Sequence, residues 1–215
     1  MNSRIRFTES WLSENPQGIE PTKTFGSIKF NIKDLLNAGV TPLKTIDPSV
    51  FKIDLSDTVY YWMENPKGEI ILGVELLKAQ DNLTISLSGK SDDLIGKAPY
   101  ADQLYQTILQ DSSKPLLFSD IKLSNDGKKI WKRLVNSGRT VTVYDRKAPG
   151  QSRQTITTPD ELEQFWKMDD PSYQRWQYVL SESGSMTHNI MAMFNTRRAR
   201  ELTSLGVDQE FFKNS

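Results

Sequence analysis

The sequence predicts an α/β fold. Its first half contains short segments in which every second residue is apolar, the period of a strand with one buried face. Its middle contains segments in which apolar residues recur three and four positions apart, the period of a helix with one buried face. Clusters of Gly, Pro, Asn and Ser separate these segments. Both kinds of element must bury an apolar face, so we expect helices to pack on a sheet.

Three strands are predicted before residue 78. Val50–Leu55 has apolar residues at alternate positions, and Thr58–Met63 is rich in β-branched and aromatic residues. Asn65-Pro66-Lys67-Gly68 is a turn sequence, because proline presets φ and glycine tolerates a positive φ. Glu69–Leu77 follows as a strand, so residues 58–77 are predicted to form a hairpin.

A fourth strand is predicted at Leu83–Leu87, opened by Asn82. Its apolar and polar residues alternate strictly, which indicates one buried face. Leu83, Ile85 and Leu87 are therefore expected to face the same way.

A helix is predicted from about Pro99 to Gln110, after Gly96. Proline suits the first helical position because its missing N–H would be unpaired there. The apolar residues then recur at helical spacing: Ala101, Leu104, Tyr105 and Ile108.

The next segment predicts a buried strand at Leu116–Phe118, then a helix capped by Ser124 and stopped by Gly138, then a strand at Thr140–Tyr144. Apolar pairs four residues apart mark the buried face of that helix: Ile130 with Leu134, and Trp131 with Val135.

The last third is polar and rich in turn residues from Arg146 to Thr157. Thr158 then caps a helix predicted to run to about Met168, and Trp176–Leu180 is predicted to be the final strand. A C-terminal helix is expected at Thr187–Leu205, packed by its first half and exposed at a turn that carries three arginines: Arg197, Arg198 and Arg200.

Length and composition favour one domain over residues 1–215, with residues 1–25 as an irregular arm and residues 183–215 as a helical extension. The chain has no cysteine and one histidine, His188, which excludes disulfides and leaves no metal site to expect. No apolar run is long enough for a membrane span, so we expect a protein of the cytoplasm with no membrane partner. The net charge of zero disfavours general nucleic-acid binding.

The loop between the fourth strand and the first predicted helix is a candidate anion site, because N–H groups at a helix start are unpaired. Gly96 and Ala98 are small enough to let a phosphate approach the backbone, and Lys97 adds positive charge, as does Lys90. Asp92 and Asp93 oppose an anion. An ordinary strand-to-helix turn explains the same residues.

Four segments together resemble the GNAT N-acetyltransferase superfamily, in particular divergent members encoded by bacteriophages. They are the strand Glu69–Gly73, the strand Leu83–Ser88, the loop Asp93–Ala98 and the helix Ala101–Leu109. The resemblance covers about residues 58–145. It implies a mixed, mostly antiparallel central sheet flanked by helices, with a C-terminal helix. It also implies that the strand Leu83–Ser88 splays away from the strand at residues 116–119.

The family's loop motif is Gln or Arg, two residues, Gly, one residue, then Gly or Ala. Gly96 and Ala98 fit this motif, whereas Asp93 stands where Gln or Arg is usual. A family tyrosine on the following helix protonates the departing thiolate, and Trp131 occupies the matching position here. An indole N–H has no usable acidity.

The resemblance implies acetyl-CoA as cofactor, with its pantetheine arm bonded to the strand edge at Leu87 and Ser88. The loop would hold the pyrophosphate, and its residues are Gly96, Lys97, Ala98, Tyr100 and Ala101. Glu75 and Asp120 are candidate general bases, and Tyr100 and Tyr105 are candidate proton donors. For each carboxylate an ordinary surface or structural role is the competing interpretation, and for Tyr105 it is core packing.

Two functions follow as hypotheses. The first is an acyl-CoA-dependent N-acyltransferase that acetylates an amine of a small molecule or a protein. The second is a catalytically inactive GNAT-like phage protein that binds a host or virion protein, which the departures at Asp93 and Trp131 motivate. A structural component of a virion is a third, weaker interpretation.

Overall fold

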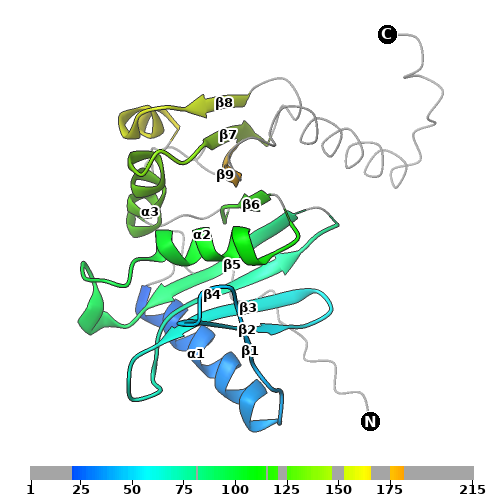
Figure 1. Cartoon of the computed structure of the whole chain (residues 1–215). Coiled ribbons are helices and arrows are strands. Elements are labelled where there is room, and N and C mark those ends of the chain that lie inside the picture. The colour runs from blue at the N-terminus through cyan, green and yellow to red at the C-terminus, as the bar shows by residue number, and fades with distance from the viewer. Residues whose placement is uncertain are drawn as a thin grey trace, which may run out of the picture.

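The computed structural model describes residues 21–80, 82–114, 116–120, 125–146, 153–165 and 175–181. Within these ranges the strands form one sheet of nine, in the order β1-β2-β3-β4-β5-β6-β9-β7-β8 (Figure 1). The strands are β1 Leu43–Lys44, β2 Val50–Asp54, β3 Thr58–Glu64, β4 Ile70–Lys78, β5 Asn82–Lys90, β6 Leu116–Phe118, β7 Val141–Asp145, β8 Arg153–Ile156 and β9 Trp176–Ser181.

Neighbouring strands of the sheet are antiparallel, except that β5 pairs with β6 in parallel. A parallel pair needs a crossover, and the helix α2, Ala101–Asp111, supplies it. The predicted fold class is confirmed, because the sheet is mixed, mostly antiparallel and flanked by helices.

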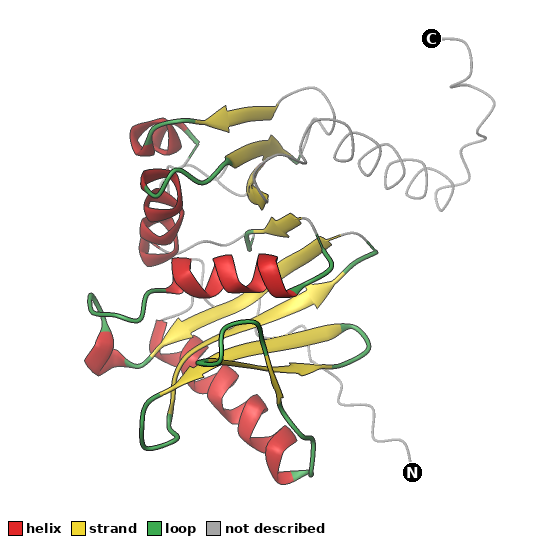
Figure 2. Ribbon diagram, viewed as in Figure 1, coloured by secondary structure: helices red, strands yellow, loops and turns green. Residues whose placement is uncertain are grey.

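Helices cover both faces of the central strands (Figure 2). The helix α1, Pro21–Asn37, lies against β4 and β5 on one face, and α2 crosses the other face. The helix α3, Asn125–Asn136, packs beside β7, α2 and the short 3₁₀ helix η3, Pro159–Gln164. A second 3₁₀ turn, η2, covers Asp92–Leu94.

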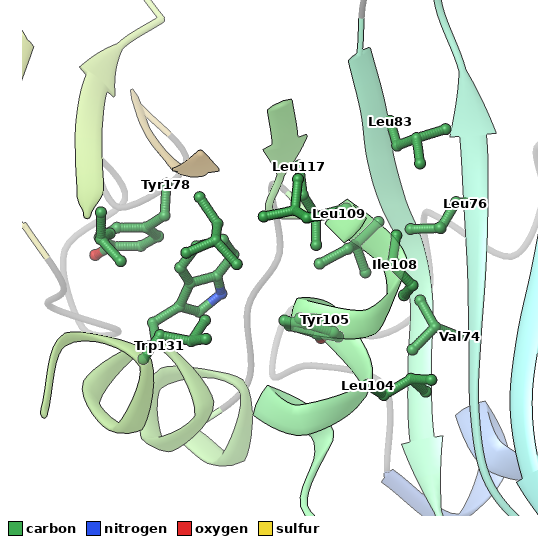
Figure 3. Packing of buried hydrophobic residues seen from close by; sticks show 14 of the residues in the cluster. Val74, Leu76, Leu83, Leu104, Tyr105, Ile108, Leu109, Leu117, Trp131 and Tyr178 are labelled. Atoms are coloured by element: carbon green, nitrogen blue, oxygen red, sulfur yellow. The ribbon is translucent and has the colours of Figure 1, made fainter. Parts of the chain in front are cut away.

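Each face of the sheet has its own apolar core. On the α2 face, side chains from β4, β5 and α2 meet Trp131 of α3 and Tyr178 of β9, so one core joins both halves of the sheet (Figure 3). On the α1 face, the core includes Phe25, Ile28 and Trp62.

The predicted strands and the central helices are confirmed. The hairpin of β3 and β4 turns at Gly68 with φ +76°, and Gly138 follows α3 with φ +75°, as a glycine stop predicts. Trp176–Leu180 is the greater part of β9.

The predicted elements need correction at several points. The helix α1 begins at Pro21, inside the segment expected as an irregular arm, and Phe25, Ile28 and Ile32 show its helical spacing. The strands β1 and β8 were not predicted, since β1 is two residues long and β8 exposes Gln154 and Thr155.

Of the helix predicted from Thr158 to about Met168, the described residues up to 165 form the 3₁₀ helix η3 and no α-helix, and residues 166–168 lie outside the described residues. The helix α2 starts at Ala101, so Gly96 does not begin it, and Pro99 lies before it. The predicted helix at residues 187–205, with its arginines, and the arm at residues 1–20 lie outside the described residues.

Candidate functional site

The strands β5 and β6 part after three residue pairs. Asn82–Thr84 pairs with Leu116–Phe118, and then β6 ends while β5 continues to Lys90. In the described part of the chain, β5 beyond Thr84 pairs with β4 alone. We call Ser86–Lys90 the free edge of β5. The family resemblance implies a splay along Leu83–Ser88, whereas Leu83 and Thr84 are paired with β6 and the strands part only after Thr84.

The two strands part because the polar groups after β6 find their hydrogen-bond partners on β9. The N–H of Ser119 donates to the carbonyl oxygen of Tyr178 at 2.8 Å, and the Tyr178 N–H donates to Ser119 Oγ at 3.1 Å. Gln177 Nε2 also donates to the Ser119 carbonyl at 2.9 Å. Because buried backbone groups must be paired, the chain after Phe118 follows β9 and leaves the edge of β5 without it.

A β-bulge at Ser86 reorients the free edge. Glu75 pairs with Leu87 but Leu76 pairs with Ile85, so Ser86 is the extra residue. The bulge turns Leu87 toward the α1 core, away from Leu83 and Ile85, which contradicts the prediction that the three face the same way. Bulges of this kind interrupt the alternation of a strand and are frequent beside functional sites.

Beyond the bulge, alternate residues of the free edge face opposite layers. A Cβ on Gly89 would lie 2.8 Å from the Cα of Phe25, so Gly89 faces α1 and allows its close approach. Ser88 and Lys90 face the α2 side, where they meet Tyr105 and Tyr100 respectively.

The loop after β5 reaches α2 through η2, Gly96 and Tyr100. Gly96 has φ +77°, which glycine adopts without strain, and Gly96, Lys97 and Ala98 are exposed. The Tyr100 hydroxyl donates to the Gly96 carbonyl oxygen at 3.3 Å, and the Tyr100 N–H donates to Gln103 Oε1 at 3.3 Å. Tyr100 therefore ties the loop to the first turn of α2.

Two cations flank the Tyr100 ring. Arg133 Cζ, from α3, lies 3.9 Å from the ring centroid, and Lys90 Nζ lies 5.2 Å from it. Burial lowers the pKa of Lys90, the charge of Arg133 lowers it further, and the charge of Asp102 opposes both effects. Two cations therefore meet at one ring, and one of them, Arg133, also lies 4.0 Å from the Asp102 carboxylate.

Tyr105 joins α2 to the free edge. Its side chain is buried and shares a hydrogen bond with the Ser88 side chain. Burial raises the pKa of Tyr105 to about 12, and the charges of Asp120 and Asp102 act in the same direction. Its phenol therefore keeps its proton at neutral pH.

The predicted site residues fall into two groups. On the α2 side, Tyr100 adjoins the loop Gly96–Ala98 through its hydrogen bond to Gly96, Ser88 meets Tyr105, and Asp120, half-buried after β6, acts electrostatically on Tyr105. Glu75 lies on the α1 face instead.

Glu75 is buried among the residues of the α1 face, where Asn31 Nδ2 donates to its Oε2 at 3.3 Å. Burial and the Glu75 charge raise the pKa of Tyr60, whose hydroxyl bonds the same carboxylate. The Glu75 carboxylate is thus already engaged by two partners, Asn31 and Tyr60.

Trp131 is 1% exposed and packs between Tyr105 and Tyr178, with ring centroids 6.2 and 5.7 Å away. It is a core residue, as an apolar position of α3 predicts. Arg133 was not anticipated as a site residue, since its role depends on Tyr100, which belongs to another element. Sequence periodicity could show only that Arg133 lies off the buried stripe of α3.

The chain has few detectable similarities to known proteins. No family model matches it, and no curated protein matches it. A solved structure described as "Putative acetyltransferase from GNAT family from Bacteroides thetaiotaomicron" aligns with a TM-score of 0.36 and 7% identity, covering 72% of this chain and 76% of that one. A TM-score this low does not define a shared fold, so the fold class rests on the sheet itself.

Among the described residues, no helix has the length and apolarity that a membrane crossing requires. Nor do three His, Cys, Asp or Glu side chains gather there into a set that could bind a metal ion.

Proposed function

We propose that the chain is an acyl-CoA-dependent N-acyltransferase whose acceptor is an amine of a small molecule or a protein. The observation that carries the proposal is the free edge of β5, which opens where β6 turns to β9 and ends beside the cations Lys90 and Arg133. Within the described residues, this edge has no second strand partner, and it ends beside positive charge.

The residues of the site fit acetyl-CoA in two respects. The backbone of Leu87 and Ser88 can bond the amides of a pantetheine arm, as a strand edge bonds a peptide. The exposed loop Gly96–Ala98, the start of α2 at Tyr100 and Ala101, and the two cations can hold phosphates. The carboxylate of Asp93, which would oppose a phosphate, accepts a hydrogen bond from the Ser91 hydroxyl.

When bound, acetyl-CoA would supply an acyl group activated as a thioester. In the proposal Asp120 accepts the proton that the amine loses, since it lies on the side of Tyr105 and Ser88. Tyr105 holds a proton at its hydroxyl for the leaving sulfur. Tyr100 positions the loop, and Glu75 supports the α1 face.

Calorimetry with acetyl-CoA tests the proposal. At a concentration a hundredfold above its dissociation constant, the ligand should raise the free energy of unfolding by about 2.7 kcal/mol. A matched pair of variants locates the binding: Lys90→Glu should weaken it, whereas Lys33→Glu, on the exposed side of α1, should not. A wild-type chain that binds no acyl-CoA would disprove the function.

A binding protein without catalysis is the second candidate, and two observations favour it. Asp93 replaces the usual basic or amide residue, and Trp131 fills the core where the family has a tyrosine. Such a protein would bind a host or virion protein. Its bacteriophage origin and its cytoplasmic location remain predictions. Ala98→Glu separates the two candidates, because it places a longer, charged side chain in an exposed loop. If binding to the host or virion protein is unchanged, the loop is not the surface that the protein uses.

A further inference from the structure

The face of the sheet that α1 covers continues past β5 onto β6, β9 and β7. Phe118 of β6 pairs with Thr84 of β5, and both lie on the α1 side, since Leu117 beside Phe118 belongs to the core of the other face. The apolar side chains on this continuation form a cluster of their own, which we call the second apolar face: Leu116, Phe118, Tyr144 and Val179.

The second apolar face is buried, although no described helix packs on it. Its four side chains are at most 6% exposed. The helix α1 packs on β4 and β5, whereas α2 and α3 contact β6 and β7 from the other face. Among the described residues there is no further α-helix. A bare sheet face would leave its apolar side chains in water, so burial to this degree requires a second layer of structure.

The chain after β9 begins on this face. Strand β9 lies between β6 and β7, in the middle of the cluster (Figure 1), and its last residue, Ser181, pairs with Leu116. Residues 182–215 follow directly. Residues 1–20 instead precede α1, which approaches β5 most closely at Gly89, at the end of that strand remote from its pairing with β6. Position therefore favours the C-terminal segment as the cover.

The sequence of the C-terminal segment suits an apolar face. It contains an unbroken apolar run, Ile190–Phe194, within the helix predicted at residues 187–205, and the two ends of this run lie on one side of such a helix. As a helix, residues 187–194 would be about 12 Å long. The two steps from β6 through β9 to β7 span about 10 Å. The first half of the predicted helix thus matches the width of the second apolar face.

We propose that residues 187–194 dock as a helix on the second apolar face, with Ile190 and Phe194 against the sheet. The half of the sheet formed by β6, β9 and β7 then has helices on both faces, as the half formed by β4 and β5 has with α1 and α2. The arginine-bearing turn, residues 197–200, extends beyond the cluster, where its charges stay in water. This docking is independent of the proposed function.

Thiol labelling of the full chain tests the docking, because the protein has no cysteine of its own. Leu116→Cys places a single thiol on the second apolar face, and Leu83→Cys places one in the core of the α2 face; both side chains are nearly fully buried. Each thiol should react slowly with iodoacetamide, as mass spectrometry measures. Adding Ile190→Glu and Phe194→Glu should speed the reaction at Leu116→Cys at least about tenfold, since charges do not stay against an apolar face, and leave Leu83→Cys unchanged.

The matched control is the pair Arg197→Glu and Arg198→Glu, which changes charge on the same predicted helix outside the docked half and should leave Leu116→Cys protected. Protection that survives Ile190→Glu and Phe194→Glu would overturn the proposal and assign the cover to another segment, such as residues 1–20. Protection that falls on dilution of the chain would overturn it in favour of a second copy. Faster reaction at Leu116→Cys and Leu83→Cys alike would mean general unfolding, and would contradict a helix that covers one face alone.

Discussion

The two ends of β5 differ in partner, polarity and burial. The first end pairs on both sides at Asn82–Thr84, and the residues before the bulge bury Leu83 and Ile85 in the core of the α2 face. The second end, after the bulge at Ser86, has one strand partner in the described structure and carries Ser88 and Lys90, both half-buried. One strand therefore serves packing in its first half and leaves hydrogen-bonding groups for a ligand in its second half.

The packing end should be the more sensitive to truncation. Leu83→Ala removes a side chain that is 2% exposed and leaves a cavity between β5 and α2, so we expect a loss of about 3 kcal/mol in the free energy of unfolding. Leu87→Ala, at the half-buried free edge, should cost about 1 kcal/mol because less apolar surface is lost. Urea denaturation measures both, and equal losses would mean that the two ends are packed alike.

At the free edge, crowding should matter more than truncation. A Cβ at Gly89 would come within 2.9 Å of backbone and Cβ atoms of Phe25, so Gly89→Ala must move α1 and should cost about 2 kcal/mol. Gly26→Ala is the control, because nothing lies within 4 Å of its Cβ and alanine favours the helix by up to about 1 kcal/mol. Thermal unfolding compares the two. A Gly89→Ala variant as stable as Gly26→Ala would show that α1 does not approach the edge so closely.

Alternation and spacing were enough to predict the strands of the meander and the helices α2 and α3, because each buries one face on its own. They could not predict the turn of Leu87 to the other layer, since a bulge depends on the register with β4. They missed β1 and β8, which are short edge strands with exposed residues. The spacing of Phe25, Ile28 and Ile32 is the sequence signal that indicates α1.

For the site, the sequence indicated the loop and the free-edge residues Leu87 and Ser88. It could not indicate Arg133, whose place depends on how α3 packs beside Tyr100. Nor could it separate Glu75 from Asp120, because only the strand orientation assigns Glu75 to the α1 face.

The pH dependence of stability offers a smaller test of the α2 side. The pKa of Tyr105 is raised to about 12 in the folded chain, above the value of about 10 for an unfolded tyrosine. Its contribution to stability is therefore complete below pH 10 and decreases as the pH rises toward 12. In urea denaturation, the free energy of unfolding of Tyr105→Phe should therefore decline less steeply over this pH range than that of the wild type. Part of the decline should remain, since burial also raises the pKa values of Tyr60, Tyr61 and Tyr178. If the free energy of unfolding falls equally steeply with pH in wild type and variant, the Tyr105 hydroxyl is exposed to water.

Backbone hydrogen exchange with and without acetyl-CoA tests the central claim most directly. The first end of β5 is already paired on both sides, so Asn82–Thr84 should exchange slowly in both states. If the arm of acetyl-CoA bonds the free edge, exchange within Ser86–Lys90 should slow on binding, together with the loop Gly96–Ala98. Binding that leaves Ser86–Lys90 unchanged and protects some other segment would contradict the account.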